Sequence, residues 1–279
     1  MRHQSVLWAS ITSTVIGMFA NITHAETKQD QQTAASKKTY NTAQKQSANQ
    51  FPWLVGVGTI ISPSPYKDTP ASQLTIPIIS YRGQNLTIAG PYLSFTVLDK
   101  GWTKTDLRAY LFPESFNPDH STNQQIKALD RRDYTIMAGA RQSFKTPYGL
   151  FGISLDGDIT GRSQGYTAAL DYRLPVPIIF NQKMLLVTPS VGLMYLSKSL
   201  SDYYYGISDQ EASVSGLAAY TPKASFSPYL STRMMFVYHD HWSISGSVQL
   251  NFLNQTITHS PIIDDQVGLT SMLTLGYRF

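Results

Sequence analysis

The sequence contains no cysteine, and after residue 25 it has no apolar run long enough to cross a membrane as a helix. The absence of cysteine excludes disulfide bonds and thiolate metal sites. A transmembrane helix needs about 18 or more consecutive apolar residues, and no later stretch approaches that length. No segment has the pattern of a long amphipathic helix. The formal charge of +4 is too small and too scattered to indicate nucleic acid as a partner.

Aromatic residues and short alternating segments are what the sequence does contain. Aromatic side chains make up 12% of the chain, with 17 tyrosines, and the mean hydropathy is close to neutral at −0.18. Near-neutral hydropathy is compatible with a membrane-spanning β-barrel, because only alternate residues of its strands face lipid, and such barrels carry aromatic girdles at both interfaces. The length of 279 residues suits one large β domain.

Residues 1–25 resemble a secretory signal peptide. Arg2 and His3 form a short basic start, and Val6 to Ile22 is mostly apolar. Thr23-His24-Ala25 places small residues at the two positions that signal peptidase reads, so we expect cleavage after Ala25. The alternative, a membrane anchor, is disfavoured because the apolar run is short and interrupted by polar residues. An exported chain without a helical span is periplasmic, secreted or an outer-membrane barrel.

Residues 26–50 are rich in Gln, Thr, Ala, Ser and Lys, with Tyr40 as the only large apolar residue. Such a segment buries too little apolar surface to offset the entropy of ordering it. We therefore predict a disordered periplasmic tail at 26–50 and one folded barrel domain at 51–279.

The last thirteen residues alternate strictly between apolar and polar side chains, which predicts a strand with one apolar face. The apolar parity consists of Val267, Leu269, Ser271, Leu273, Leu275, Tyr277 and Phe279. A transmembrane barrel needs a complete last strand, because that strand pairs with the first and closes the sheet. The ending Tyr277 and Phe279 also resembles the signal read by the barrel assembly machinery. The alternative is the last strand of a soluble sandwich.

About twelve strands follow one another from residue 53 onward, an even number as bacterial single-chain barrels have. The expected strands are Trp53–Ile61, Leu74–Tyr81, Asn85–Gly90, Tyr92–Leu98, Lys104–Phe112, Asp133–Ser143, Gly149–Ile159, Gln164–Leu174, Met184–Leu196, Ala224–Tyr238, Trp242–Leu253 and Val267–Phe279. Without the two short strands around Gly90-Pro91 the number would be ten. We predict an all-β fold, an antiparallel transmembrane barrel.

Connection lengths alternate between short and long, which is the asymmetry of an outer-membrane barrel with short periplasmic turns and long outward loops. The expected periplasmic connections are Arg82–Gln84, Asp99–Thr103, Phe144–Tyr148, Pro175–Lys183 and His239–His241. The expected outward ones include Ser62–Gln73, Pro113–Arg132, Ser197–Lys223 and Asn254–Gln266.

Several short segments, in order, resemble the MipA/OmpV family of outer-membrane proteins over nearly the whole chain after the tail. They are Gly56-Val57-Gly58 with Pro65-Tyr66, Pro77 with Tyr81-Arg82-Gly83, Leu129-Asp130-Arg131-Arg132-Asp133, Asp158-Ile159-Thr160-Gly161 with Gly165, Asp202-Tyr203-Tyr204-Tyr205-Gly206-Ile207, Ala219-Tyr220-Thr221-Pro222, Ser260-Pro261-Ile262 and Gly276-Tyr277-Arg278-Phe279. The resemblance implies an outer-membrane barrel. The family is named for a member that scaffolds a murein hydrolase and a murein synthase, so it also implies, more loosely, a scaffolding role.

Charged residues on the lumen-facing parity of the strands are the candidate lumen site. They are Asp106, Arg108, Asp133, Arg141, Asp156, Asp158, Asp171, Arg173, Arg233 and Arg278. Two hypotheses fit them: a charged constriction that selects solutes, or a set of ion pairs that fills a narrow barrel. Both signs occur in similar number, which favours ion pairs.

Two other groups of residues are candidates for function. Tyr203, Tyr204 and Tyr205, in a long outward loop, predict either contacts with a ligand or partner, or packing within the loop. The histidines after the signal peptide do not lie in a recognisable nucleophile motif, although His259 directly precedes Ser260. We expect no catalytic residues, metal or cofactor.

The sequence therefore predicts a non-enzymatic outer-membrane barrel that holds murein-remodelling enzymes on its periplasmic side. Its expected partners are outer-membrane lipids, the barrel assembly machinery and a murein hydrolase or synthase. The alternative is a narrow channel for small solutes, including antibiotics, and an outer-membrane enzyme ranks third.

Overall fold

The computed structural model describes residues 52–180, 183–238 and 241–279. The chain divides into two units, 1–46 and 47–279, and the described residues belong to the second. The predicted signal peptide and tail lie outside the described residues. Within these residues, no helix is both long and apolar enough to cross a membrane.

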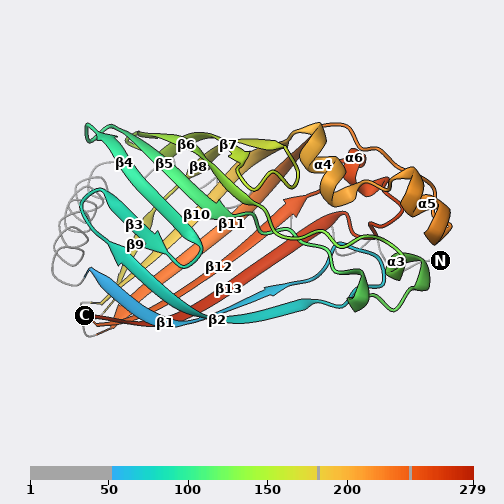
Figure 1. Cartoon of the computed structure of the whole chain (residues 1–279). Coiled ribbons are helices and arrows are strands. Elements are labelled where there is room, and N and C mark those ends of the chain that lie inside the picture. The colour runs from blue at the N-terminus through green and yellow to red at the C-terminus, as the bar shows by residue number, and fades with distance from the viewer. Residues whose placement is uncertain (1–51, 181–182, 239–240) are drawn as a thin grey trace, which may run out of the picture. The chain divides into compact units, whose positions relative to one another are not determined.

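The described part is a closed antiparallel barrel whose sheet runs in the order β11-β12-β13-β1-β2-β3-β4-β5-β6-β7-β8-β10-β9, with a further pairing of β10 and β11 (Figure 1). The strands are β1 (Trp53–Ser62), β2 (Ser72–Arg82), β3 (Leu86–Ala89), β4 (Tyr92–Asp99), β5 (Thr103–Leu111), β6 (Ile136–Lys145), β7 (Leu150–Asp158), β8 (Tyr166–Arg173), β9 (Val176–Phe180), β10 (Lys183–Leu196), β11 (Ser225–Tyr238), β12 (Trp242–Phe252) and β13 (Val267–Arg278). Because β8 and β9 pair with successive parts of β10, the ring has twelve strand positions. The prediction of a barrel of about twelve strands is confirmed.

The last strand closes the ring, as its alternation predicted. β13 pairs with β1 from Leu54↔Arg278 to Ile61↔Ser271, and with β12 along its whole length. Its apolar parity is exposed on the outside of the barrel at Leu273, Leu275 and Tyr277. The same holds around the wall, where exposed apolar side chains alternate with inward polar ones, because successive residues of a strand point to opposite faces.

One predicted turn is a strand. Residues 176–180 were expected within the connection Pro175–Lys183, but they form β9, which continues the line of β8 along β10. Proline has no N–H to donate, so the ladder is interrupted at Pro175 and resumes one residue later. The adjacent Leu174 N–H still donates to the carbonyl of Pro189, at 3.0 Å. β8 and β9 are therefore one strand broken by proline.

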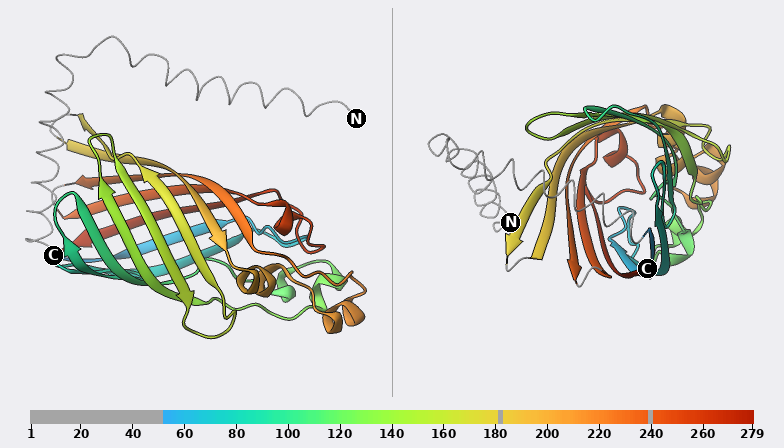
Figure 2. Two further views of the ribbon diagram at one scale, coloured as in Figure 1. Left: turned by 90° about the horizontal axis from the view of Figure 1, so that it is seen from above. Right: turned by 90° about the vertical axis from the view of Figure 1, so that its left-hand side faces the viewer.

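The connections are short at one end of the barrel and long at the other, as predicted. The short-turn end holds residues 83–85, 100–102 and 146–149 and the C-terminus. The long-loop end holds segments 63–71, 112–135, 197–224 and 253–266, which we call the cap. Figure 1 shows the helices gathered at this end, and Figure 2 shows the strands as a ring. The helices are η1 (Pro118–His120), α3 (Gln124–Lys127), α4 (Lys198–Tyr205), α5 (Asp209–Ser215) and α6 (Gln255–Thr258).

The hydrophobic core of the described chain lies in the cap and not in the barrel. Its buried members are Tyr66, Phe112, Phe116, Ile126, Leu129, Met137, Leu196, Leu200, Tyr204, Tyr205, Ile207, Ile257, Ile262 and Ile263. All but Met137 and Leu196 come from the long loops, so the loops fold together into a compact structure at one end of the barrel.

Candidate functional site in the lumen and the cap

Five of the predicted lumen residues lie on the inward face of β5 to β8 and form two ion-paired groups. The first is Arg108 with Asp156. The Arg108 Nε donates to Asp156 Oδ1 at 2.8 Å, and its Nη2 donates to the other carboxylate oxygen, a bidentate geometry. β6 lies between these two strands, and its Gly139 is in register with both residues. A Cβ at Gly139 would lie 2.8 Å from Asp156 Oδ1, so this glycine makes room for the pair.

The second group is Arg141, Asp171 and Arg173. The Arg141 Nη2 donates to both Asp171 oxygens, at 2.6 and 2.7 Å, and Arg173 Nε lies 3.0 Å from Asp171 Oδ2. Here too a glycine lies on the strand between: a Cβ at Gly152 of β7 would lie 2.0 Å from the Arg141 Nη2. Arg108 and Arg141 thus each pair with an aspartate two strands away. In both cases a glycine on the intervening strand leaves room for the arginine side chain.

The remaining inward charges differ in their surroundings. Asp106 accepts from Thr96 Oγ1 at 2.7 Å and lies 3.0 Å from Lys104 Nζ. Arg233 of β11 is exposed to the lumen, and within the described residues it has no hydrogen bond or ion pair. Next to β11, the inward face of β12 is polar but uncharged, with Ser243, Ser245, Ser247, Gln249 and Asn251. The described lumen therefore has one wall of paired charges and, beside Arg233, a polar but uncharged face on β12.

Two of the predicted lumen charges lie elsewhere. Asp133 precedes β6 and belongs to the cap, where its half-exposed carboxylate pairs with Arg131 at 2.9 Å. Asp158 ends β7 and holds the following turn, because its carboxylate accepts from the backbone N–H groups of Thr160, Ser163 and Gln164. The strand was expected to begin at Asp133, but the hydrogen bonds of the cap delay it to Ile136.

The tyrosines 203–205 at the end of α4 pack into the cap. Tyr204 is fully buried, its hydroxyl lies 3.1 Å from Thr135 Oγ1, and its ring centroid is 5.6 Å from that of Phe112. Tyr205 is 2% exposed and stacks on Tyr66, with centroids 6.2 Å apart. For these two residues the contacts are those of loop packing.

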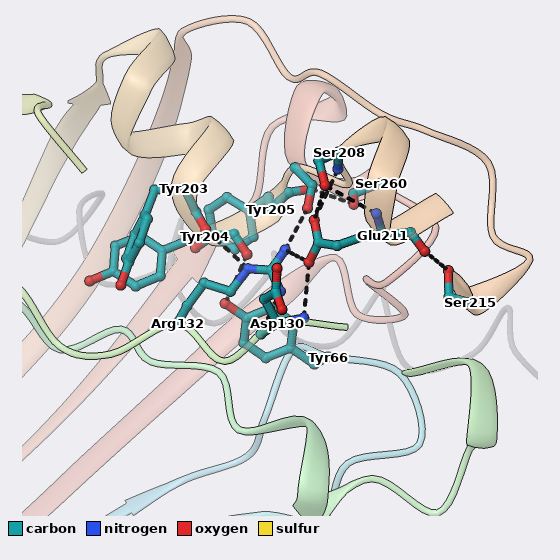
Figure 3. A network of polar contacts seen from close by, with 11 residues as sticks. Tyr66, Asp130, Arg132, Tyr203, Tyr204, Tyr205, Ser208, Glu211, Ser215 and Ser260 are labelled. Carbon is teal, nitrogen blue, oxygen red and sulfur yellow. Dashed lines mark hydrogen bonds and ion pairs between the residues drawn. The ribbon is translucent and has the colours of Figure 1, made fainter. Parts of the chain in front are cut away.

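A buried ion pair organises the cap around these tyrosines (Figure 3). Arg132 Nη2 lies 2.6 Å from Glu211 Oε1, and their side chains are 7% and 8% exposed. Arg132 also donates to the carbonyl oxygens of Asp130, Tyr203 and Gly206. A buried charge is tolerated where its partner and its hydrogen bonds replace water, and this guanidinium has both.

The Glu211 carboxylate also accepts several hydrogen bonds besides its ion pair with Arg132. Its carboxylate accepts from the backbone N–H of Asp130 at 3.0 Å and from that of Ser208 at 2.9 Å, and Ser208 Oγ in turn caps α5. Burial raises the pKa of Glu211, but these hydrogen bonds and the charge of Arg132 outweigh it, so the pKa lies below the ordinary value. The sequence signal for this arrangement is the Ser-x-x-Glu capping box formed by Ser208 and Glu211.

Glu114 is the contrasting carboxyl group of the cap. Burial raises its pKa to about 7, and within the described chain no hydrogen bond or ion pair reaches its carboxylate. Its charge is one of the causes, after burial, that raise the pKa of Tyr205. The cap thus contains a carboxyl group that changes its charge near neutral pH.

In the His259-Ser260 pair, the serine hydroxyl is engaged in a structural hydrogen bond. Ser260 is 2% exposed, and its Oγ donates to the carbonyl oxygen of Tyr205 at 2.6 Å. Among the described residues no cluster of His, Asp and Glu side chains has the arrangement of a metal site.

Comparison with known proteins shows to which family the chain belongs. The family model described as MltA-interacting protein MipA matches residues 55–279. The MltA-interacting protein of Escherichia coli K12 is 31% identical over 229 residues, covering 81% of this chain and 89% of that protein. The putative outer membrane protein YiaT of the same strain is 29% identical over 236 residues, covering 84% and 93%. Among solved structures, the outer membrane protein OprG of Pseudomonas aeruginosa matches with a TM-score of 0.29 and 11% identity, covering 82% of this chain and 96% of OprG. The chain therefore belongs to the MipA/OmpV family of outer-membrane β-barrel proteins.

Proposed function

We propose that this barrel is a non-enzymatic anchor that holds murein-remodelling enzymes at the inner side of the outer membrane. The observation that carries the proposal is the closed cap. A core containing the fully buried Tyr204, Phe116 and Ile126 packs the long loops together at one end of the barrel. Loops packed into such a core differ from the free outward loops of an open pore, and ion pairs occupy the inward face of β5 to β8. A relative 31% identical to this chain is named for its interaction with MltA.

The short-turn end is the surface that we assign to the partner, and we place it in the periplasm. Two neighbouring turns there carry exposed aromatic side chains, Trp102 at 62% exposure and Tyr148 at 78%. The backbone joins the turns, because Lys145 N–H donates to the Trp102 carbonyl at 2.7 Å. Exposed tryptophan and tyrosine are the side chains most enriched where proteins bind one another.

The test is direct binding between the purified barrel in lipid nanodiscs and a purified murein hydrolase of the same organism. We expect binding to the unaltered barrel and loss of affinity in Trp102→Ala/Tyr148→Ala. The control Val214→Ala, on the opposite end in α5, should bind as the unaltered barrel does. Absence of binding to the unaltered barrel, for murein hydrolases and synthases alike, would overturn the proposal.

A narrow channel is the second candidate, and the free Arg233 favours it. An exposed, unpaired cation beside a wall of serine and amide side chains is a lining suited to water and small anions. Planar-bilayer recording of the refolded barrel tests it. Stepwise conductance that falls in Arg233→Ala supports the channel, and silence removes it.

A further inference from the structure

We propose that the barrel wall has a lateral opening between β2 and the β3–β4 hairpin, through which small uncharged apolar molecules pass between the lumen and the membrane. This goes beyond the anchor function and does not depend on it. β3 is only four residues long and pairs with β2 through Ser80, Tyr81 and Arg82 alone. The last backbone hydrogen bond between them runs from Gly90 N–H to the carbonyl of Ile79, at 3.1 Å.

Beyond that bond, residues 73–78 of β2 have a free edge. They pair with β1 on one side, and no hydrogen bond within the described chain joins their other side to any element. The hairpin turns back at Gly90, whose φ of +57° is a conformation that glycine adopts readily. Pro77 lies within this edge, and proline in sheets is confined to edge strands, strand ends and bulges because it cannot donate to a ladder.

The free edge lies at the depth of the membrane. Pro77 and Thr75 are in register with Val57 and Thr59 of β1, and Thr59 is in register with Leu273 of β13. The outward side chain of Leu273 is 62% exposed, as expected of a lipid contact. Unpaired backbone groups cost several kcal/mol each in hydrocarbon, and membrane barrels normally leave no edge. Within the described chain, the wall is therefore not closed by backbone hydrogen bonds at this place.

The lumen side of the opening is apolar, unlike the charged inward face of β5 to β8. The inward residues of β2 are Leu74, Ile76 and Ile78, and Ile78 lies beside the inward Met272 of β13, since both approach Gly58. Leu74 remains 47% exposed although it points inward. Water in contact with these side chains is readily displaced by an apolar molecule. The long loops of the cap pack together at one end of the barrel axis, and the side opening gives a second route between the lumen and the membrane.

Uptake of the apolar dye N-phenyl-1-naphthylamine by whole cells tests the proposal. Cells that produce the barrel should take up the dye faster than cells that lack it. Ile76→Trp fills the lumen side of the opening and should return the rate to that of cells without the barrel. The matched control, Thr75→Trp, places the same bulk on the lipid-facing side of the same strand and should leave the rate high. Equal rates with and without the barrel, or no effect of Ile76→Trp, would overturn the proposal.

Hydrogen exchange of the unaltered protein in nanodiscs tests the edge without any variant. We expect alternate amides within residues 73–78 to exchange fast, while those of β1 that bond to both neighbours stay protected. Uniform protection of residues 73–78 would mean that the edge is covered, and the opening would be wrong. This readout does not depend on murein enzymes, so its failure is distinct from failure of the anchor function.

Discussion

At the scale of single residues, two carboxyl groups of the cap show how surroundings decide charge. Glu211 has a buried guanidinium and three donors around it, whereas Glu114 has burial without partners. The first is therefore held ionised, and the second resists ionisation. Each leads to a prediction about the stability of the cap.

Glu114→Gln should remove a pH dependence of stability. The pKa of Glu114 is raised from 4.5 to about 7 in the folded protein, so the folded state binds this proton more tightly than the unfolded state. Stability is then highest at low pH and falls as pH rises between these two values. The variant should match the unaltered protein in melting temperature at pH 5 and exceed it at pH 8. The exposed control Asp265→Asn should not show this difference. If Glu114→Gln and the unaltered protein have equal melting temperatures at pH 5 and also at pH 8, the raised pKa of Glu114 would be contradicted.

Glu211→Ala should open the cap, because it leaves Arg132 buried without its counter-charge. Removing one member of a buried pair costs about 3–5 kcal/mol. We expect protease cleavage within 197–224 to become much faster in the variant while the barrel stays intact. The control Asp133→Ala breaks the exposed pair with Arg131, which contributes at most about 1 kcal/mol. Equal cleavage of the two variants would mean that the buried pair does not hold the cap.

At the scale of strands, glycines in β6 and β7 let arginines pair across a neighbour. Gly139 and Gly152 lie under Arg108 and Arg141, and a side chain at either position would meet the pair. Small residues on a strand thus determine which charges meet on the two strands beside it.

Gly139→Ala should destabilise the barrel. The added Cβ would lie 2.0 Å from the backbone carbonyl oxygen of Leu155, which cannot move without disturbing β7. Overpacking of this kind costs about 1–3 kcal/mol. The matched control is Gly157→Ala, where no atom lies within 4 Å of the added Cβ. Thermal unfolding in detergent should show a lower midpoint for Gly139→Ala only, and equal midpoints would argue against the close approach.

At the scale of the whole molecule, the asymmetry between the two ends gives the barrel a direction. The packed cap and all the described helices lie at the long-loop end, and the short turns lie with the C-terminus at the other. Outer-membrane barrels point their long loops outward. The cap should therefore face the exterior, and the aromatic turns the periplasm.

Cysteine labelling on whole cells tests this direction, and the chain has no cysteine of its own to interfere. Val214→Cys, in α5 and 69% exposed, should react with a membrane-impermeant maleimide. Tyr148→Cys, in a short turn, should react only after the outer membrane is permeabilised. The reverse pattern would invert the topology and remove the partner surface proposed at the short turns.

The barrel, the number of its strands, the closing strand and the unequal ends were all predictable from the sequence. Period-2 alternation and connection length are local properties. The residues of each strand therefore indicate by themselves which face of the strand meets lipid. The inward positions of Asp106, Arg108, Arg141, Asp156, Asp171, Arg173 and Arg233 follow from the same parity.

Only the tertiary structure decided which side chains meet. Arg108 reaches Asp156 because Gly139, on a third strand, leaves room, and no local pattern records that. From the sequence, Tyr204 and Tyr205 were equally compatible with ligand contacts and with packing. In the structure, loops far apart in sequence pack around both side chains. The free edge of β2 likewise depends on how far a neighbouring hairpin extends. Alternation determines the face a residue occupies, whereas its partners depend on register and long-range contacts between separate segments.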